Sequence, residues 1–181
     1  MRKRAGERNP GEITTAAIAE RMKLTQGALF RHFPSKDALW EAVMRWVEGK
    51  LFGEIDKATG VTSSVDALKS MFMAHIEFVN RHPGVPRMLF AELQKPDNTS
   101  AKKVARSLLQ RYAKRLKELL EQGVRDGALD SGIDPGAASG MFIGTVQGLV
   151  MQLMISGEVE IKVSDAEKVF MLYLRGIKKG A

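Results

Sequence analysis

Small and polar residues near the start of the chain have the types and spacing needed to read a DNA duplex. They lie between residues 13 and 36, in the segment ITTAAIAERMKLTQGALFRHFPSK. Gln26 can pair bidentately with adenine, Ala28 can contact a thymine methyl group, and Gly27 allows the backbone to approach a base edge. Thr15 is placed at a helix N-terminus, where free amides can bind a phosphate. These residues predict a DNA-binding element.

Two short helices joined by a tight turn are expected to position these residues. Thr14 and Thr15 are suited to cap the first helix, because a threonine hydroxyl accepts a hydrogen bond from a free amide. Ile18, Ala19 and Met22 then recur at helical spacing and share one face. The first helix therefore begins near residue 15.

The second helix is expected to carry the base-reading residues. Leu24 is predicted to be buried in the turn, Thr25 is a second N-cap, and Leu29 and Phe33 continue the apolar face. The helix ends at about Phe33, because Pro34 disfavours the α conformation at the residue before it. This layout is that of a helix-turn-helix, whose second helix lies in the major groove.

The segment resembles the DNA-binding motif of the TetR family of bacterial transcriptional regulators. That motif opens with TT-x-x-IA and ends its recognition helix with Y-x-HF-x-x-K, and the ending here is FRHFPSK. The resemblance implies that Phe30, His32 and Lys36 contact phosphates, which fixes register but carries little sequence information. For His32 the alternative is capping of the helix-end carbonyls, and Arg31 could reach either a base or a phosphate. The predicted DNA contacts are Thr15, Thr25, Gln26, Gly27, Ala28, Phe30, Arg31, His32 and Lys36.

Three features depart from the family pattern. Lys23 occupies the turn position that usually holds glycine, and a positive φ there would cost about 1 kcal/mol. Phe30 replaces the usual tyrosine, which removes a phenolic hydrogen bond to phosphate. Family members also carry an amphipathic helix before the motif, whereas twelve residues precede Ile13 here. We expect either that a natural N-terminal segment is missing or that a basic arm enters the minor groove through Arg2, Lys3, Arg4 and Arg8.

Composition supports a polyanionic partner and an intracellular location. Lys and Arg number 28 against 21 Asp and Glu in 181 residues, for a net charge of +7. The chain has no cysteine, which excludes disulfides, thiolate zinc sites and a cysteine nucleophile. The charged N-terminal residues lack the apolar run of a secretory signal, so a cytoplasmic, nucleoid-associated protein is expected. The three histidines show no metal-ligand spacing, and neither an enzyme nor a cofactor is predicted.

Hydrophobic periodicity beyond the motif predicts an all-α protein of about eight helices. The division expected is a DNA-binding domain over residues 1–52 and a ligand-binding and dimerisation domain over residues 53–181. Further helices are predicted over about residues 35–57, 65–81, 88–93, 101–125, 135–155 and 164–179. Trp46 is assigned to the apolar face of its helix, Lys102 to a solvated basic face, and residues 159–163 look strand-like.

Residues 135–157 contain no charge over a length close to the ~20 residues of a membrane span. Glycines, glutamines and serines interrupt this stretch and basic clusters do not flank it, so a fully buried helix is preferred over a membrane helix. Gly136, Gly140, Gly144 and Gly148 recur every four residues on one face. Because each glycine inside a helix costs roughly 1 kcal/mol, close approach of a partner helix is expected there. A close contact within the monomer or a kinked helix is the alternative, and the resemblance implies a four-helix dimer interface.

The ligand is the least determined part of the prediction. Met71, His75 and Met88 are candidates for a pocket, because methionine repacks around varied shapes. For His75 a hydrogen-bonded core residue is preferred. The resemblance implies a small-molecule inducer that separates the two DNA-binding heads, which differential affinity for the two head spacings would explain. The alternative is a DNA-bound scaffold that recruits a protein partner through the basic helix between Lys102 and Arg125.

Overall fold

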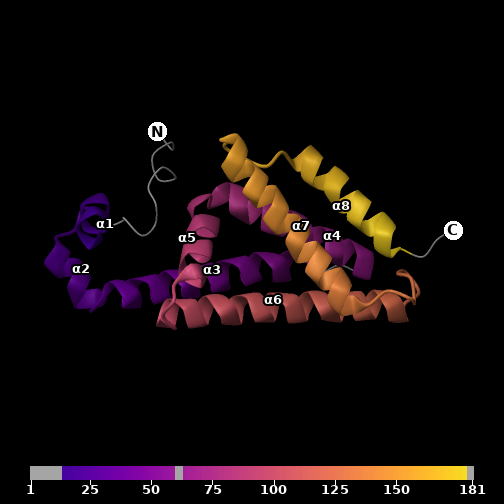
Figure 1. Ribbon diagram of the computed structural model, residues 1–181, viewed down its shortest axis with the longest axis horizontal. Helices are drawn as coiled ribbons and strands as arrows, with labels where there is room; N and C mark the ends of the chain where they lie inside the picture. The colour runs from indigo at the N-terminus through magenta and orange to yellow at the C-terminus, as the bar shows by residue number, and fades with distance from the viewer. Residues whose placement is uncertain (1–13, 60–62, 179–181) are drawn as a thin grey trace. The chain divides into compact units, whose positions relative to one another are not determined.

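Helices make up all the regular structure in residues 14–59 and 63–178, the part of the chain that the computed structural model describes (Figure 1). The elements are α1 (Thr15–Arg21), α2 (Gln26–His32), α3 (Lys36–Ala58), α4 (Ser64–Arg81), α5 (Gly84–Gln94), α6 (Ser100–Arg125), α7 (Pro135–Ser156) and α8 (Val163–Ile177). The prediction of an all-α protein of about eight helices is confirmed. The predicted basic arm of Arg2, Lys3, Arg4 and Arg8 lies outside the described residues.

The described residues fall into two compact units. Those within Met1–Gly49 and Pro83–Leu108 form the first, and those within Lys50–His82 and Leu109–Ala181 form the second. The division into domains over residues 1–52 and 53–181 stays a prediction.

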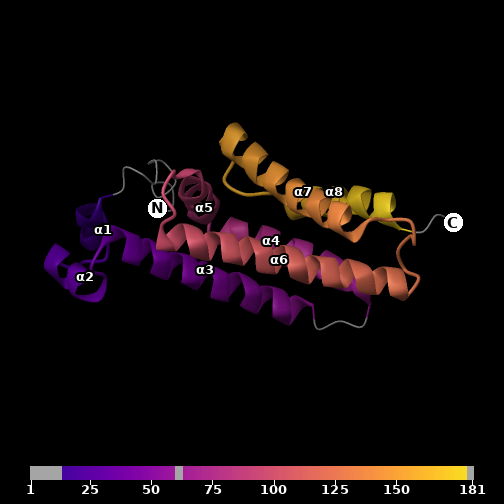
Figure 2. The ribbon, with the colours of Figure 1, turned by 60° about the horizontal axis from the view of Figure 1, so that its bottom comes forward.

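The helix-turn-helix has its own small core. Ala19 of α1, Leu29 of α2 and Leu39 of α3 are buried together, and Ile18 and Phe33 pack against them. Figure 2 shows α1 and α2 next to each other at the start of α3. The apolar residues predicted from helical spacing therefore pack one face of α2 against α1 and α3. The opposite face of α2 is exposed.

Leu24, predicted to be buried in the turn, and Met22, assigned to the apolar face of the first helix, are both exposed. Leu24 is 41% exposed and Met22 is 52% exposed, so the prediction of a buried Leu24 is wrong. The turn projects both side chains away from the core that Ala19 and Leu29 form. Trp46 is also wrongly assigned, because it is 43% exposed while Met44 of the same helix is fully buried.

Aromatic rings form the centre of the second unit, where α4, α7 and α8 pack against one another. Phe72 of α4 lies 5.3 Å from the ring of Phe142 and 5.4 Å from that of Phe170, and Tyr173 lies 5.5 Å from Phe142. The Tyr173 hydroxyl donates to the Ala138 carbonyl at 3.0 Å, which satisfies the one polar group in this ring cluster.

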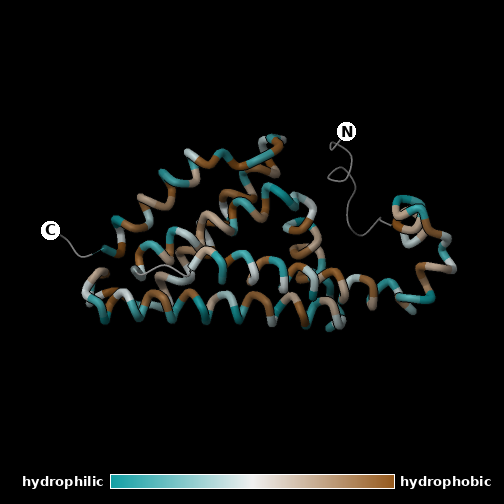
Figure 3. The backbone as a smooth tube through the Cα atoms, turned by 180° about the vertical axis from the view of Figure 1, so that it is seen from behind, coloured by the Kyte–Doolittle hydropathy of each residue, from teal (hydrophilic) through white to brown (hydrophobic). Residues whose placement is uncertain are grey.

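Helix α6 is strongly amphipathic, and Figure 3 shows hydrophobic and hydrophilic residues alternating along it. Its buried apolar residues include Val104, Leu108, Leu116 and Leu120. The assignment of Lys102 to the solvated face is wrong, because Lys102 is 6% exposed and its ammonium group donates to the Lys95 carbonyl at the end of α5. The favourable interaction of a cation with a helix C-terminus explains why a lysine is buried here.

Two turn predictions also change. Helix α5 begins at Gly84, earlier than the predicted residue 88, and Pro86 lies in its first turn, where the missing N–H leaves no hydrogen bond unmade. Residues 159–162, which look strand-like in sequence, form no strand, and Val163 opens α8. Asn80 holds this connection by donating to the Ile161 carbonyl at 2.9 Å and accepting from the Ile161 amide at 2.8 Å.

Helix α7 contradicts the expectation of a fully buried helix. Its length and apolar composition would suit a membrane span, yet 28% of its most apolar window is buried. Phe142, Val146 and Val150 face the core of the second unit, while Met141 and Ile155 are 55% and 71% exposed. Since α7 has apolar residues on both faces, helical periodicity in the sequence does not show which face is buried.

Candidate DNA-binding interface

Threonine caps define both helices of the motif. The Thr14 hydroxyl accepts from the Ala17 amide at 3.1 Å and the Thr25 hydroxyl accepts from the Ala28 amide at the same distance. Both threonines adopt the extended conformation that an N-cap requires, with ψ near 150°. The predicted start of each helix is confirmed, with Thr14 as the residue that caps α1.

The residues predicted to read bases lie together on the exposed first turn of α2. Gln26 and Gly27 are exposed and Ala28 is half-buried. A Cβ atom at Gly27 would meet nothing within 4 Å, so no side chain in the described part of the chain crowds this turn. A base edge could therefore approach the backbone here.

Gln26 is held by a second predicted DNA contact. Its Nε2 donates to the Thr15 hydroxyl at 3.1 Å, which links the first turns of α1 and α2. An amide nitrogen carries two hydrogens, so Gln26 keeps one donor and its carbonyl oxygen for a base. The Thr15 hydroxyl keeps its own hydrogen for a phosphate oxygen. Sequence reasoning proposed both residues but did not predict that they contact each other.

Basic and aromatic residues follow at the other end of α2. Phe30 is 40% exposed, Arg31 and His32 are exposed in the last turn, and Lys36 is the first residue of α3. The hydroxyl of Ser35 accepts from the Ala38 amide at 3.0 Å and caps α3. Three cationic or titratable side chains thus accompany one exposed ring at the junction of α2 and α3, which suits contact with a phosphate backbone.

The turn between α1 and α2 has a positive φ at Lys23, the conformation considered in the sequence analysis. This residue has a φ of 56°, in the left-handed region that favours glycine. Its amide donates to the Glu20 carbonyl at 3.0 Å, which is how the turn ends α1. Lys23 is exposed, so its ammonium group projects from the turn.

An open face on α7 is the second candidate interface. Gly136, Gly140, Gly144 and Gly148 are all exposed, and a Cβ atom at the last three would meet nothing within 4 Å. Within residues 14–59 and 63–178, no side chain or backbone of the monomer makes a close contact with those three glycines. Sequence reasoning missed the large apolar residues that are exposed on α7 and α8, although helical spacing from the glycines could have found those on α7. They are Met141, Met151 and Ile155 on α7 and Met171 and Leu172 on α8, each 43% to 71% exposed.

The candidate ligand residues do not all belong to one unit. Met71 and His75 lie in the second unit and Met88 lies in the first. The Nδ1 of His75 lies 3.0 Å from the Tyr112 hydroxyl, and the two rings are edge to face at 5.2 Å. Burial lowers the pKa of His75 to about 4, because a desolvated imidazolium is unfavourable. A neutral, hydrogen-bonded His75 fits the preferred core role.

Known proteins resemble the chain in both halves. Residues 2–43 match the bacterial regulatory proteins of the tetR family, and residues 61–158 match the tetracyclin repressor-like C-terminal domain. The nucleoid occlusion factor SlmA of Marinomonas sp. (strain MWYL1) is 36% identical over 88 residues, which cover 48% of this chain and 45% of that protein. SlmA of Alteromonas mediterranea is 31% identical over 117 residues, covering 62% of this chain and 59% of that protein. The chain thus spans less than two thirds of the length of these relatives.

Solved structures share the fold at low identity. The ketosteroid transcriptional regulator KstR2 of Mycobacterium tuberculosis has a TM-score of 0.78 and 19% identity, covering 97% of this chain and 89% of that one. The regulator FadR of Bacillus subtilis, in complex with stearoyl-CoA, has a TM-score of 0.79 and 17% identity, covering 92% and 90%. Because the C-terminal family match alone covers more than half of the sequence, the chain belongs to the TetR family of bacterial transcriptional regulators.

Proposed function

We propose that this TetR-family transcriptional regulator is a repressor that binds a palindromic operator as a homodimer and leaves it when a small-molecule inducer binds. The observation that carries the proposal is the exposed first turn of α2, where Gln26 and Gly27 face outward from a helix-turn-helix with its own core. A major groove admits an α-helix presented in this way. The proposed location is the cytoplasm, on the nucleoid.

Base reading is assigned to α2. Gln26 offers one amide hydrogen and one carbonyl oxygen beyond its bond to Thr15, which is the pair that adenine requires. Ala28 supplies a methyl group for contact with thymine, and Gly27 supplies room for the backbone. Thr15 and Thr25 would present their hydroxyls and nearby amides to phosphates.

Phosphate binding is assigned to the junction of α2 and α3. Four residues within seven positions are assigned to phosphates: Phe30, Arg31, His32 and Lys36. Contacts to phosphates fix the register of the protein on DNA. Lys36→Ala should weaken binding about equally on all sequences and lower the salt slope by about one unit. Gln26→Ala should instead relax the preference at one base pair in each half-site. A Lys36→Ala variant with altered base preference would contradict this assignment.

Dimerisation is assigned to the open face of α7 and α8, with Gly136, Gly140, Gly144 and Gly148 at its centre. Exposed glycines beside exposed Met141 and Ile155 form a surface that a second copy can approach closely. A lipid bilayer is a poorer occupant, because Gln147 and Gln152 are exposed on the same helix and polar groups are costly in hydrocarbon. Two copies related by a two-fold axis would match a palindrome.

The inducer is proposed to be an acyl-coenzyme A or a similar long apolar molecule. The structures with this fold include a FadR in complex with stearoyl-CoA and an AibR in complex with isovaleryl coenzyme A and operator DNA. Met71 and His75, both in the second unit, remain the candidate residues for the site. An inducer that binds the dimer more tightly when its heads are separated would release DNA by that difference in affinity alone.

Selection from a random duplex pool followed by sequencing tests the proposal. An enriched palindrome supports a dimeric operator reader and supplies the duplex for inducer screening. Enrichment of a single half-site would contradict the dimer, and absence of enrichment would contradict sequence reading. Acyl-coenzyme A thioesters of increasing chain length should then lower the fraction of duplex bound, with free coenzyme A as the control.

A scaffold that stays on DNA and recruits a protein is the second candidate. It is kept because the two relatives described above are named nucleoid occlusion factors, a name that mentions no small-molecule inducer. The docking face would be the exposed basic side of α6, which carries Arg106, Lys114 and Lys117. Operator binding that no acyl-coenzyme A alters, together with loss of a partner on charge reversal along α6, would favour the scaffold over the sensor.

A further inference from the structure

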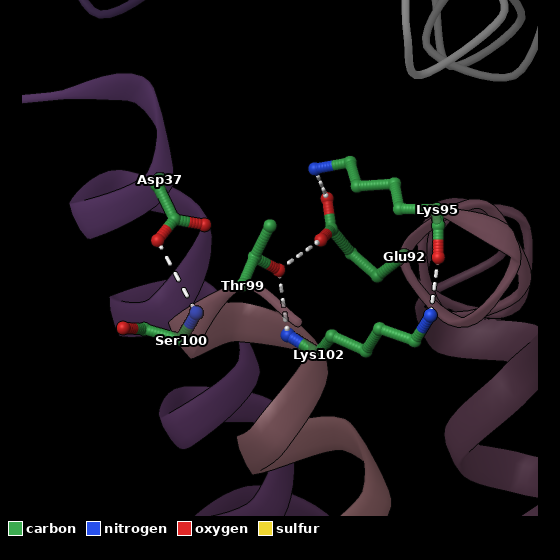
Figure 4. A network of polar contacts seen from close by, with 6 residues as sticks. All are labelled: Asp37, Glu92, Lys95, Thr99, Ser100 and Lys102. Carbon is green, nitrogen blue, oxygen red and sulfur yellow. Dashed lines mark hydrogen bonds and ion pairs between the residues drawn. The ribbon is translucent and has the colours of Figure 1, made fainter. Parts of the chain in front are cut away.

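A polar network in the first unit joins the end of α5 to the start of α6 (Figure 4). Glu92 is 3% exposed and accepts from the Lys95 ammonium group at 2.5 Å and from the Thr99 hydroxyl at 3.4 Å. Thr99 also caps α6 by accepting from the Lys102 amide at 3.1 Å. Hydrogen bonds therefore hold the connection between α5 and α6 at the end of α5 and at the start of α6.

Asp37 ties this connection to the DNA-binding motif. Its Oδ2 accepts from the Ser100 amide at 3.3 Å, across 63 positions of sequence. Ser100 is the first residue of α6, and its amide would otherwise lack a partner in the helix. The other carboxylate oxygen of Asp37 is buried and has no hydrogen-bond partner in the described part of the chain. A buried polar atom without a hydrogen bond lowers the stability of the fold, so a role for Asp37 other than stability would explain its position.

We propose that Asp37 is a positioning residue for DNA binding, which holds the first turn of α3, and with it Lys36, against the N-terminus of α6. The proposal rests on the phosphate contact assigned to Lys36. Asp37 follows Lys36 directly in that turn, so whatever displaces Ser100 displaces the backbone from which Lys36 projects. The end of α5 and the start of α6 thereby become a place where a change in the protein alters affinity for DNA.

Simple electrostatics predicts the opposite result for removal of this carboxylate. Asp37 is a negative charge next to a residue assigned to a phosphate, so its loss should strengthen DNA binding if charge were its only effect. A positioning role predicts weaker binding instead. The sign of the change therefore separates the two explanations.

The test measures affinity for the duplex selected by the wild-type protein, over a range of salt concentrations. Asp37→Ala removes the acceptor, and Ser100→Pro removes the donor without a change of charge. Proline is well tolerated at the first position of a helix, because the amide that it lacks needs no helical partner. Asp97→Ala is the matched control, since Asp97 is an exposed acid in the connection between α5 and α6. Helix content and oligomeric state of every variant are checked first.

We expect Asp37→Ala and Ser100→Pro each to weaken binding roughly fivefold or more and to lower the salt slope toward that of Lys36→Ala. Either variant combined with Lys36→Ala should bind no more weakly than Lys36→Ala alone, because all act through one contact. Asp97→Ala should bind as well as the wild type or better.

Three results would overturn the positioning role: tighter binding by Asp37→Ala, unchanged binding by Ser100→Pro, or losses that add to that of Lys36→Ala. A wild-type protein that selects no duplex would instead overturn the proposed function. Base preference is measured alongside, and a change in it would count against a contact that acts only through phosphate.

Discussion

Replacing three glycines of α7 by alanine should change the stability of the monomer and the strength of dimerisation in opposite directions. The variant is Gly140→Ala/Gly144→Ala/Gly148→Ala. A Cβ atom at each position meets nothing within 4 Å, so alanine introduces no clash with the described residues of one copy. Each replacement then stabilises the helix by about 1 kcal/mol, or about 3 kcal/mol for the three together.

Dimerisation should be weakened by at least as much. If α7 of a second copy approaches this face closely, each added methyl group overpacks the contact, at a cost of about 1 kcal/mol or more per site. Three sites on the interface give about 3 kcal/mol, which raises the dissociation constant by roughly 100-fold. The same variant would therefore be the more stable monomer and the weaker dimer.

Sedimentation equilibrium gives the dissociation constant, and thermal unfolding followed by circular dichroism gives the stability. Unfolding is measured at protein concentrations below and above the dissociation constant, because association itself contributes to apparent stability. The control is Gly49→Ala/Gly53→Ala on α3, where a Cβ atom also meets nothing within 4 Å. It should stabilise the helix and leave association unchanged. A triple variant that dimerises as tightly as the wild type would refute the assignment of α7 to the interface.

Three further predictions concern local stability. Lys23→Gly should stabilise the protein by up to about 1 kcal/mol in thermal unfolding, since glycine tolerates the φ of 56°; unchanged or lower stability would show that the turn is not strained. Burial lowers the pKa of His75 to about 4, below the 6.5 of the unfolded chain, so its contribution to stability is complete above about pH 6.5 and is lost toward pH 4. Denaturant unfolding at several pH values should show this loss of stability in the wild type and not in His75→Leu. The same loss in His75→Leu would contradict the reasoning. Asn80→Ala should cost about 2 kcal/mol, because it leaves the amide and carbonyl of buried Ile161 without partners; a loss below about 0.5 kcal/mol in the same assay would contradict this.

Local chemistry explains why so much of the motif could be predicted. The Thr25 cap and the left-handed turn at Lys23 depend on residues a few positions apart, and the small core of Ala19 and Leu29 joins two helices only ten positions apart. Interactions of this range are encoded in spacing, so the starts of both helices follow from the sequence alone. The resemblance to the TetR family rests on the same residues.

Burial could not be predicted with the same success. Periodicity shows which residues share a face, but the neighbouring elements decide whether that face is covered. Lys102 is buried because the end of α5 offers it a carbonyl, and Leu24 is exposed because no element lies over the turn in the described structure. Helix α7 is apolar on both faces, and the fold covers one of them.

The sequence by itself determined the helices of the motif and their threonine caps, and it predicted which residues face DNA, since these features depend on neighbours along the chain. The tertiary structure alone decided which faces stay open and which distant groups meet. The contact between Asp37 and Ser100 joins residues 63 positions apart, and no periodicity or propensity of either segment encodes it. It exists because the folded chain brings a carboxylate to an amide that lacks a helical partner.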